Sequence, residues 1–360
     1  MNPRRRTPRL RHRQTSGGVG PLRRVLLRLK RMADLSAVRS EPPAALVHTM
    51  NADEARRVEL TVAARDTDRI PKVPGAGRVT ERGGVATQIM HNGVRVEEGC
   101  YYGAWMTEII RRLRGHHEPQ EEWAFHCVVE RLRRDTKSPV MVEFGSFWAY
   151  YSLWVAHELP GSRCVLVEPD EAHLRVGMRN FELNGLTPAA TRHAAVGAHH
   201  GETIALRYES DGETRTVPVV SLDGLREELQ LARVDLVLCD TQGAELDAIA
   251  GCAGAIRDRA LRFMFVSTHH HTITGDPLTH QRCVERLTSL GAHILVEHTV
   301  HESASGDGLI VASFDERDAG VTIDVSRTRA SDTLFGPLEP ELAAAFDALR
   351  ELRGAPAPPS

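Results

Sequence analysis

The feature that most constrains this chain is a pattern that begins at residue 139 and continues almost to residue 315. Short apolar segments alternate there with amphipathic segments of helical period, which is typical of strands joined by crossover helices. Nearly continuous apolar strands indicate a parallel sheet that is covered on both faces. The strands we expect are 140–144, 164–169, 191–196, 235–241, 262–268, 293–298 and 308–314, and the helices are 149–158, 171–183, 222–229, 244–258 and 278–290.

The last two expected strands are joined by only nine residues, 299–307. Nine residues are too few for a helical crossover, so these two strands should be antiparallel neighbours. The earlier strands are far enough apart for right-handed crossovers. The sequence therefore predicts an α/β fold with a doubly wound, seven-stranded, mostly parallel sheet over residues 139–315.

The segment before this core, 34–138, predicts an N-terminal hairpin and helical cap. Alternating segments flank Asn92-Gly93, which is a strong hairpin signal. Helical patterns follow at 103–115 and 119–135. After the core, we expect a C-terminal tail over 316–360 that carries one helix, 338–352.

The first 33 residues contain eleven Lys or Arg and no acid, which predicts a basic, disordered arm. Within it, residues 22–32 place apolar side chains on one helical face and basic ones on the other, so this segment could make peripheral contact with an anionic membrane. The alternative is a solvated arm. The rest of the chain carries the acidic excess, so we expect no nucleic acid as a ligand.

The composition narrows the compartment and the class of site. The six cysteines are spread singly, which disfavours a disulfide framework and a zinc knuckle and suits a reducing cytosol. No apolar run is long enough to span a membrane, and no secretory signal is evident. We therefore expect a cytoplasmic protein.

The candidate site lies where the parallel strands end, because ligands of open α/β sheets bind there. The first strand ends in Glu143-Phe144-Gly145-Ser146, and Gly145 would let the backbone approach a ligand closely. The second ends at Glu168-Pro169, with a carboxylate placed to accept both hydroxyls of a ribose. The fourth ends with Asp240 and Gln242.

The first turn, GSFWAYYS, does not match a dinucleotide fingerprint and has no Lys or Arg to neutralise phosphate. The crevice residues are acidic and aromatic, Tyr151 among them. That mixture suits a cationic nucleoside without phosphate, and S-adenosyl-L-methionine is the common one.

Three segments together, VEFGSFWAYYSLWVA, VLVEPDEAHLRVGMRNFELNG and DLVLCDTQGAELDAIAG, resemble the FkbM-type S-adenosylmethionine-dependent methyltransferases over about residues 115–314. This resemblance implies a Rossmann-like class I methyltransferase fold and O-methylation of a sugar, glycan or secondary metabolite. It also implies cofactor contacts for the residues that match the motifs, namely Glu143, Gly145, Ser146, Glu168, Ala195, Val196, Asp240 and Gln242. Phe144, Tyr151 and Pro169 lie at the same strand ends and first turn, and we expect cofactor contacts for them as well. One departure is Ala149, which stands where the family has a second glycine.

The candidate catalytic residues are His269, Asp240 and Glu121. His269 closes the fifth strand and could take a proton from the acceptor hydroxyl, since an imidazole titrates near neutral pH. Glu121, with Glu118 and Gln120, begins a helix that could cover the cofactor. The alternatives are structural roles. Asp240 could cap a helix, and the glutamates at the start of the helix could serve only to stabilise its N-terminus.

Two other function classes stay open, and no metal ligands are assigned. A metal-assisted hydrolase or lyase could use His269–His271 with His117 and Glu121, although none of these clusters has the spacing of a helical zinc site. A non-catalytic scaffold could keep the fold and bind a partner instead.

Overall fold

The computed structural model describes residues 50–328, together with 345, 348 and 349. The expected basic arm, including 22–32, lies outside the described residues. So does most of the expected helix 338–352, of which the three described positions are helical. In the part of the chain that is described, no helix combines the length and the apolar character needed to cross a membrane.

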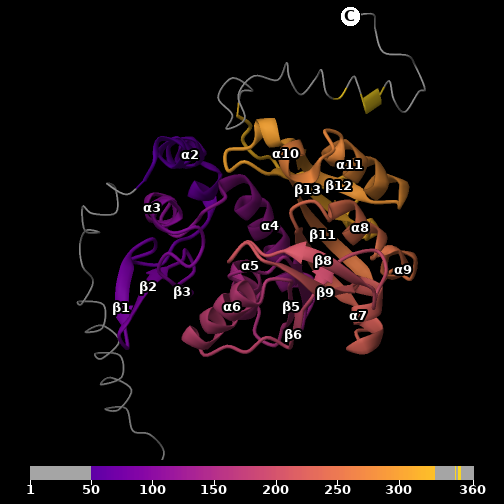
Figure 1. Ribbon diagram of the computed structural model, residues 1–360, viewed down its shortest axis with the longest axis horizontal. Helices are drawn as coiled ribbons and strands as arrows, with labels where there is room; N and C mark the ends of the chain where they lie inside the picture. The colour runs from indigo at the N-terminus through magenta and orange to yellow at the C-terminus, as the bar shows by residue number, and fades with distance from the viewer. Residues whose placement is uncertain (1–49, 329–344, 346–347, 350–360) are drawn as a thin grey trace, which may run out of the picture. The chain divides into compact units, whose positions relative to one another are not determined.

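The central sheet confirms the predicted fold class (Figure 1). Its strand order is β12-β13-β11-β10-β4-β5-β6. Five adjacent strands of this sheet, β11, β10, β4, β5 and β6, are parallel to one another. Strand β13 runs antiparallel to both β11 and β12, and its pairing with β12 is the one that the short 299–307 connection predicts. The strands are β4 (Val140–Phe144), β5 (Arg163–Glu168), β6 (Ala190–His193), β10 (Val234–Asp240), β11 (Leu261–Thr268), β12 (His293–His298) and β13 (Gly308–Ser313).

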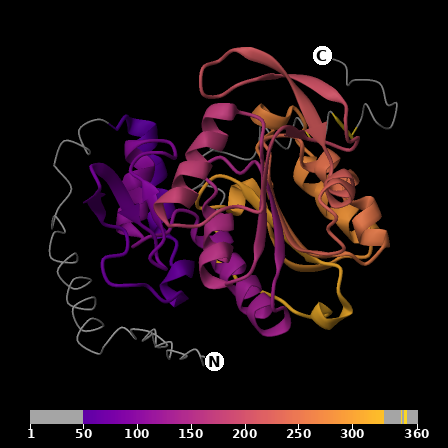
Figure 2. The same ribbon diagram turned by 90° about the horizontal axis from the view of Figure 1, so that it is seen from below.

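Helices cover both faces of this sheet (Figure 2). The side chains of each strand alternate between the two faces, so Met141 and Leu166 join the apolar cluster on one face and Val142 and Val165 that on the other. The first face packs against α4 (Pro119–Asp135), α5 (Tyr150–Glu158) and α6 (Glu171–Leu183). The second packs against α7 (Leu222–Glu228), α8 (Glu245–Ala250), α9 (Ala253–Arg257) and α11 (Thr279–Ser289).

Two predicted elements are divided in the structure. The expected strand 191–196 ends with β6, and its remainder, β7 (Ala195–Val196), joins a separate sheet of order β7-β9-β8. The expected helix 244–258 is interrupted at Gly251, which approaches Gly197 so closely that an added Cβ would lie 2.5 Å from the Gly197 carbonyl oxygen. Both divisions arise from long-range packing that a local pattern does not contain.

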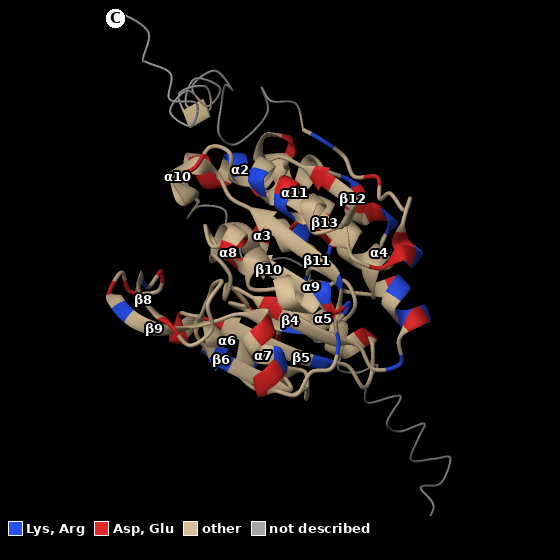
Figure 3. Cartoon of the chain, turned by 90° about the vertical axis from the view of Figure 1, so that its right-hand side faces the viewer, with Lys and Arg blue, Asp and Glu red and all other residues tan. Residues whose placement is uncertain are grey.

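The hairpin of β8 (Thr203–Arg207) and β9 (Thr214–Val220) was not predicted. The sequence does contain a hairpin signal at this place, because Asp211-Gly212 lies between two segments of alternating polarity. Gly212 has a φ of +74°, the left-handed conformation that such a turn requires. Figure 3 shows this hairpin projecting beyond α6, with acidic and basic residues at its end.

The N-terminal segment contains the predicted hairpin, formed by β2 (Val85–Ile89) and β3 (Arg95–Glu97), with β1 (Val79–Arg82) added on its edge. The turn is wider than a two-residue one, since Met90 N–H still bonds to the Val94 carbonyl. Asn180 of α6 anchors β3 by accepting the Glu97 N–H at 2.9 Å. The other elements of this segment are α2 (Ala52–Ala63), η2 (Asp66–Arg69) and α3 (Ala104–Arg112).

After β13, the short helix η4 (Glu316–Asp318) ties the end of the core to the sheet through a buried ion pair. Arg262 of β11 is 2% exposed and donates to both oxygens of Asp318, at 3.0 and 3.1 Å. Its Nη2 also donates to Asp135, at the end of α4, at 2.7 Å. This one guanidinium therefore links β11, α4 and the chain that follows the core.

Asp318→Asn should lower the free energy of unfolding by at least about 3 kcal/mol, because the variant removes the buried carboxylate that accepts from two nitrogens of the buried Arg262 guanidinium. Urea unfolding measures the change. Asp324→Asn is the matched control, since Asp324 is exposed, and its stability should change by less than about 0.5 kcal/mol. Equal stabilities for the two variants would contradict the role given to the ion pair.

Candidate active site

A cavity of about 330 Å³ lies at the carboxyl ends of β4, β5 and β10, where the sheet topology places a ligand. Its size falls in the range of small-molecule and cofactor sites. The structure brings ten of the sequence-predicted residues to its wall, which are Glu143, Gly145, Ser146, Tyr151, Glu168, Pro169, Ala195, Val196, Asp240 and Gln242.

Three predicted residues do not line this cavity. Phe144 faces the other side of the sheet, because it follows Glu143 in the strand and neighbouring side chains alternate. Glu121 and His269 lie behind the cavity wall. Glu121 contacts Ser267, and His269 contacts Asp240, which lines the cavity. The prediction that Phe144 contacts a cofactor therefore does not agree with its burial in the core.

Gly145 is required by the packing of the strand ends. Its φ is +75°, and an added Cβ would lie 1.7 Å from the carbonyl oxygen of Asp240. From the sequence, we expect this glycine to make room for a ligand. The structure shows that the neighbouring strand already occupies the space where a side chain would begin.

Ala149 adopts the left-handed conformation, with φ 59° and ψ 33°, at the position where the resemblance implies a glycine. Its methyl group points toward Gly177 of α6, where an added Cβ would lie only 3.0 Å away. Ala149 is fully buried and does not line the cavity. The extra methyl is thus accommodated by a glycine in the facing helix and does not narrow the cavity.

Glu168 ends β5 with its carboxylate on the cavity wall. It accepts the backbone N–H of Phe147 at 3.0 Å and that of Asp170 at 2.9 Å, one on each oxygen. Burial outweighs these bonds and raises the pKa of Glu168 to about 7. Each oxygen keeps a further acceptor position, so the carboxylate can receive two more donors.

Glu143 lies on the same face of the sheet, one strand away. It accepts the Ser152 N–H at 3.0 Å, and burial raises its pKa to about 8. A neighbouring positive charge strongly favours the ionised form of a carboxylate that is held in this way. The cavity floor therefore offers two partly protonated acids that a cationic ligand would ionise.

The start of α4 forms the opposite wall as a buried hydrogen-bond network. Glu122 accepts from the His117 N–H at 2.6 Å and from the Tyr150 hydroxyl at 3.0 Å. His117 also contacts Glu118, at 3.2 Å. Burial alone would lower the pKa of His117, but these two glutamates outweigh it and raise that pKa to about 10.

Within this segment, the three predicted candidates have different positions. Glu118 lines the cavity and accepts the hydroxyl of Tyr151 at 3.1 Å. Glu121 accepts the Ser267 hydroxyl at 2.9 Å, and burial raises its pKa well above the usual value. Gln120 instead bonds to the carbonyls of Glu302 and Ser326 and to the Ala304 N–H, so it fixes distant chain segments to α4.

His269 lies behind Asp240, at the end of β11. Its Nε2 is 3.1 Å from an Asp240 oxygen, and its Nδ1 is 2.7 Å from Glu245 of α8. Burial alone would lower the pKa of His269, but the surrounding carboxylates, Asp307 foremost, raise it well above the usual value. The Asp240 side chain is 31% exposed and is the member of this group that faces the cavity.

Sequence reasoning missed two sets of cavity residues. Tyr101 and Tyr102 come from the turn before α3, and Tyr101 stacks on Trp148 with ring centroids 4.7 Å apart. Ile204, Leu206 and Tyr208 come from the unpredicted β8–β9 hairpin. The Asp-Gly turn signalled the hairpin, but nothing local in the sequence signals that either segment reaches the cavity.

Backbone strain is present at the cavity mouth. Tyr102, Phe147 and Gln242 are non-glycine residues with φ of 49°, 34° and 50°, and all three line the cavity. Tyr102 and Gln242 approach each other at 3.4 Å between the hydroxyl and the amide nitrogen. Such conformations are costly and cluster at ligand sites, where the surrounding structure holds them.

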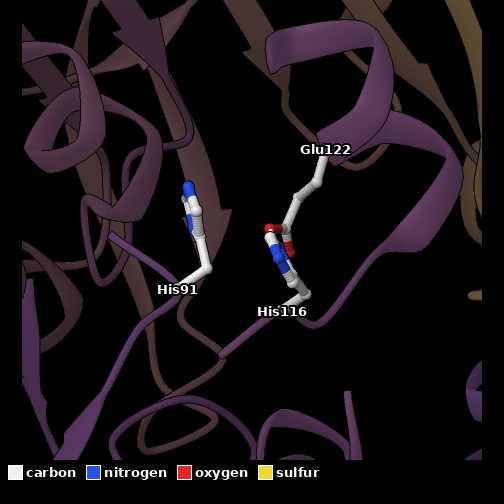
Figure 4. A group of neighbouring side chains, drawn as sticks. All are labelled: His91, His116 and Glu122. Atoms are coloured by element: carbon white, nitrogen blue, oxygen red, sulfur yellow. The ribbon is translucent and has the colours of Figure 1, made fainter. Parts of the chain in front are cut away.

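A separate buried group, His91, His116 and Glu122, brings possible metal-ligating atoms within 4.8 Å of one another (Figure 4). The two imidazole rings are stacked, with centroids 4.4 Å apart and planes inclined by 19°. Lone pairs in two stacked rings do not converge on one ion, and Glu122 is already occupied by the donors described above. Among residues 50–328, the histidines of 269–271 do not form such a group with His117 and Glu121.

These observations define an α/β protein with a Rossmann-like sheet, a nucleoside-sized cavity at its strand ends and an acidic, aromatic lining. Residues 139–294 match the model of the methyltransferase FkbM domain. This segment is therefore similar to the methyltransferase FkbM domain, and the protein is a methyltransferase.

No curated protein sequence matches the chain. Among solved structures, it is similar to a precorrin-6y C5,15-methyltransferase from Geobacter metallireducens, with 16% identity over 52% of this chain and 86% of that one, and a TM-score of 0.33. It is also similar to the N-terminal domain of human METTL16 in complex with SAH, with 17% identity over 55% and 71% of the two chains, and a TM-score of 0.35.

Gly177→Ala should destabilise the protein by about 1–3 kcal/mol, because the new methyl would lie 2.8 Å from the Phe147 carbonyl and 3.0 Å from the Ala149 methyl. Adding Ala149→Gly should recover part of the loss, since it removes one of the two close contacts. Ala149→Gly alone should be nearly neutral, because relief at a positive φ offsets the lost methyl burial. Urea unfolding of the four proteins gives the coupling, and strictly additive effects would contradict it.

Proposed function

We propose that this methyltransferase uses S-adenosyl-L-methionine and methylates a hydroxyl group of a sugar, glycan or secondary metabolite. The observation that best supports this cofactor is the position of the Glu168 carboxylate. It lies on the cavity wall at the end of β5 and keeps acceptor positions available for hydrogen bonds. A ribose diol presents two adjacent donors to such a group, and charge-assisted bonds of this kind are strong.

The other cavity residues fit the same ligand. Ala195 and Val196 offer an apolar wall beside Glu168, suited to a purine ring. Glu143 offers a carboxylate for an ammonium group, and Trp148 and Tyr151 offer aromatic faces for a cation. Among the described residues that line the cavity, Arg207 is the single Lys or Arg, and it lies on the exposed β8–β9 hairpin. A lining with so little positive charge suits a ligand without phosphates.

When bound, S-adenosyl-L-methionine supplies a methyl group on a positively charged sulfur. The residues of this chain orient the acceptor, exclude water and receive the proton that the acceptor hydroxyl loses. We assign that proton to Asp240, because its carboxylate is the one at the end of β10 that reaches the cavity. His269, which the sequence suggested as the base, has its two ring nitrogens placed between Glu245 and Asp240.

The acceptor is proposed to be a small polar molecule or a glycan. Glu118 and Asp240 leave the transfer end of the cavity acidic, which opposes nucleic acid, and Tyr101 and Tyr102 add aromatic faces on which a sugar ring can pack. A cytoplasmic location and a peripheral membrane contact through residues 22–32 remain proposals from the sequence.

Isothermal titration with S-adenosyl-L-methionine tests the cofactor, and Glu168→Ala sharpens the test. The variant loses two charge-assisted acceptors, each worth roughly 1.5–3 kcal/mol, so its Kd should rise at least about a hundredfold. Glu171→Ala, in the exposed first turn of α6, is the control and should bind as wild type does. Absence of binding by the wild-type protein would favour a non-catalytic scaffold, and unchanged affinity in Glu168→Ala would remove this residue from the ribose.

The affinity should also depend on pH. The pKa of Glu168 is raised to about 7, whereas accepting two hydroxyl donors requires its ionised form. Affinity should therefore be full above pH 7 and fall by up to about tenfold for each pH unit below it. Glu143, with a pKa near 8, adds its own dependence, so the measurement is the difference between wild type and Glu168→Gln. Identical pH profiles for these two proteins would refute the assignment.

A further inference from the structure

Behind the cavity wall, three side chains from three different elements form one continuous chain of contacts. Asp240 ends β10, His269 follows β11, and Glu245 begins α8. The imidazole lies between the two carboxylates, 3.1 Å from Asp240 through Nε2 and 2.7 Å from Glu245 through Nδ1. His269 is 7% exposed and Glu245 is fully buried, so water does not compete for the contact between them.

The contacts of Glu245 indicate which ring nitrogen carries a proton. Its Oε1 accepts the backbone N–H of Gly243 at 2.9 Å, and the same oxygen faces Nδ1 of His269. Its other oxygen, Oε2, is buried and has no hydrogen-bond partner among the described residues. A carboxylate that already accepts at Oε1 is best satisfied by a second donor there, which places a proton on Nδ1.

A second proton is then needed at the other end of the ring. A neutral imidazole with its proton on Nδ1 would point a lone pair from Nε2 at the Asp240 oxygen, and two acceptors at 3.1 Å repel each other. The contact becomes a hydrogen bond either with a doubly protonated ring or with a protonated Asp240. Asp307, whose Oδ1 is 3.7 Å from Nε2, adds a further carboxylate to this side and favours the charged ring.

We propose that Glu245 is a positioning residue: it holds His269 as an imidazolium, and the Nε2–H of His269 in turn fixes Asp240 as an ionised carboxylate on the cavity wall. The raised pKa of His269 agrees with this arrangement. Asp240 is otherwise surrounded by acids, with Glu118, Glu121 and Asp307 on neighbouring elements, and the imidazolium is the positive charge in contact with it.

For the methyl transfer, the consequence concerns the proton of the acceptor. As the acceptor oxygen bonds to the methyl carbon and the carbon–sulfur bond breaks, its O–H bond also breaks and the proton passes to Asp240. An ionised Asp240 can take that proton, whereas a protonated one cannot. This role of the contacts among Asp240, His269 and Glu245 rests on the proposed function. The protonation of His269 does not rest on it, and that protonation can be measured without cofactor or acceptor.

The test is nitrogen-detected NMR of the full chain with ¹⁵N-labelled histidine, in which His269→Gln identifies the His269 signals. In the wild type, both ring nitrogens of His269 should stay protonated through pH 7.5. Glu245→Gln keeps the shape and the hydrogen-bonding oxygen but removes the charge, so the pKa of His269 should fall by about 1–3 units. Asp247→Asn is the matched control, because Asp247 is exposed on the same helix, and should leave the titration unchanged.

Asp307→Asn approaches the ring from its other side and should also lower the pKa of His269, which keeps the test available if Glu245→Gln does not fold. A wild-type His269 that titrates near its ordinary value of about 6.5 would overturn the proposal. So would a shift below 0.5 units in a folded Glu245→Gln. Failure of the cofactor titration would refute the proposed function and leave this result standing.

Discussion

The close approach of two strand ends is the constraint on which the site depends. The backbone at Gly145 lies against the Asp240 carbonyl, so closely that no side chain fits between them. This approach brings the loop after β4 beside the end of β10, and it turns the chain so that the Phe147 N–H reaches Glu168. Three carboxylates, Glu143, Glu168 and Asp240, therefore meet at one cavity although they come from three strands.

Burying these acids has an energetic consequence. Carboxylates removed from water resist ionisation, and the pKa values of Glu143 and Glu168, about 8 and about 7, express that cost. His117, which lines the cavity together with Glu118, and His269, which lies behind the wall, each contact buried acids. The cavity is thus prepared for a cation, and a cationic ligand would recover part of the cost of burial.

The agreement between sequence and structure follows the range of the interactions. Helices 119–135 and 171–183 and strand 140–144 agree with prediction residue for residue, because each has a clear period and a clear start. The exclusion of Phe144 from the cavity could also have been predicted, since it alternates with Glu143. Neither the contribution of Tyr101 and Tyr102 nor the position of Ile204 over the cavity could, because these contacts join segments far apart in the chain.

The sequence by itself determined the order along the chain of the central sheet's strands and their covering helices, the face of the sheet to which each strand residue points, and the edge at which the acids end. These properties follow from local periods of two and 3.6 residues and from the length of the connections. Only the tertiary structure decided which acid faces the cavity and which is held behind it, because that depends on the packing of α4, α8 and the β8–β9 hairpin around the strand ends. It also decided the state of His269: a lone histidine after a strand reads as a base, whereas one between Glu245 and Asp240 is held as a charged partner.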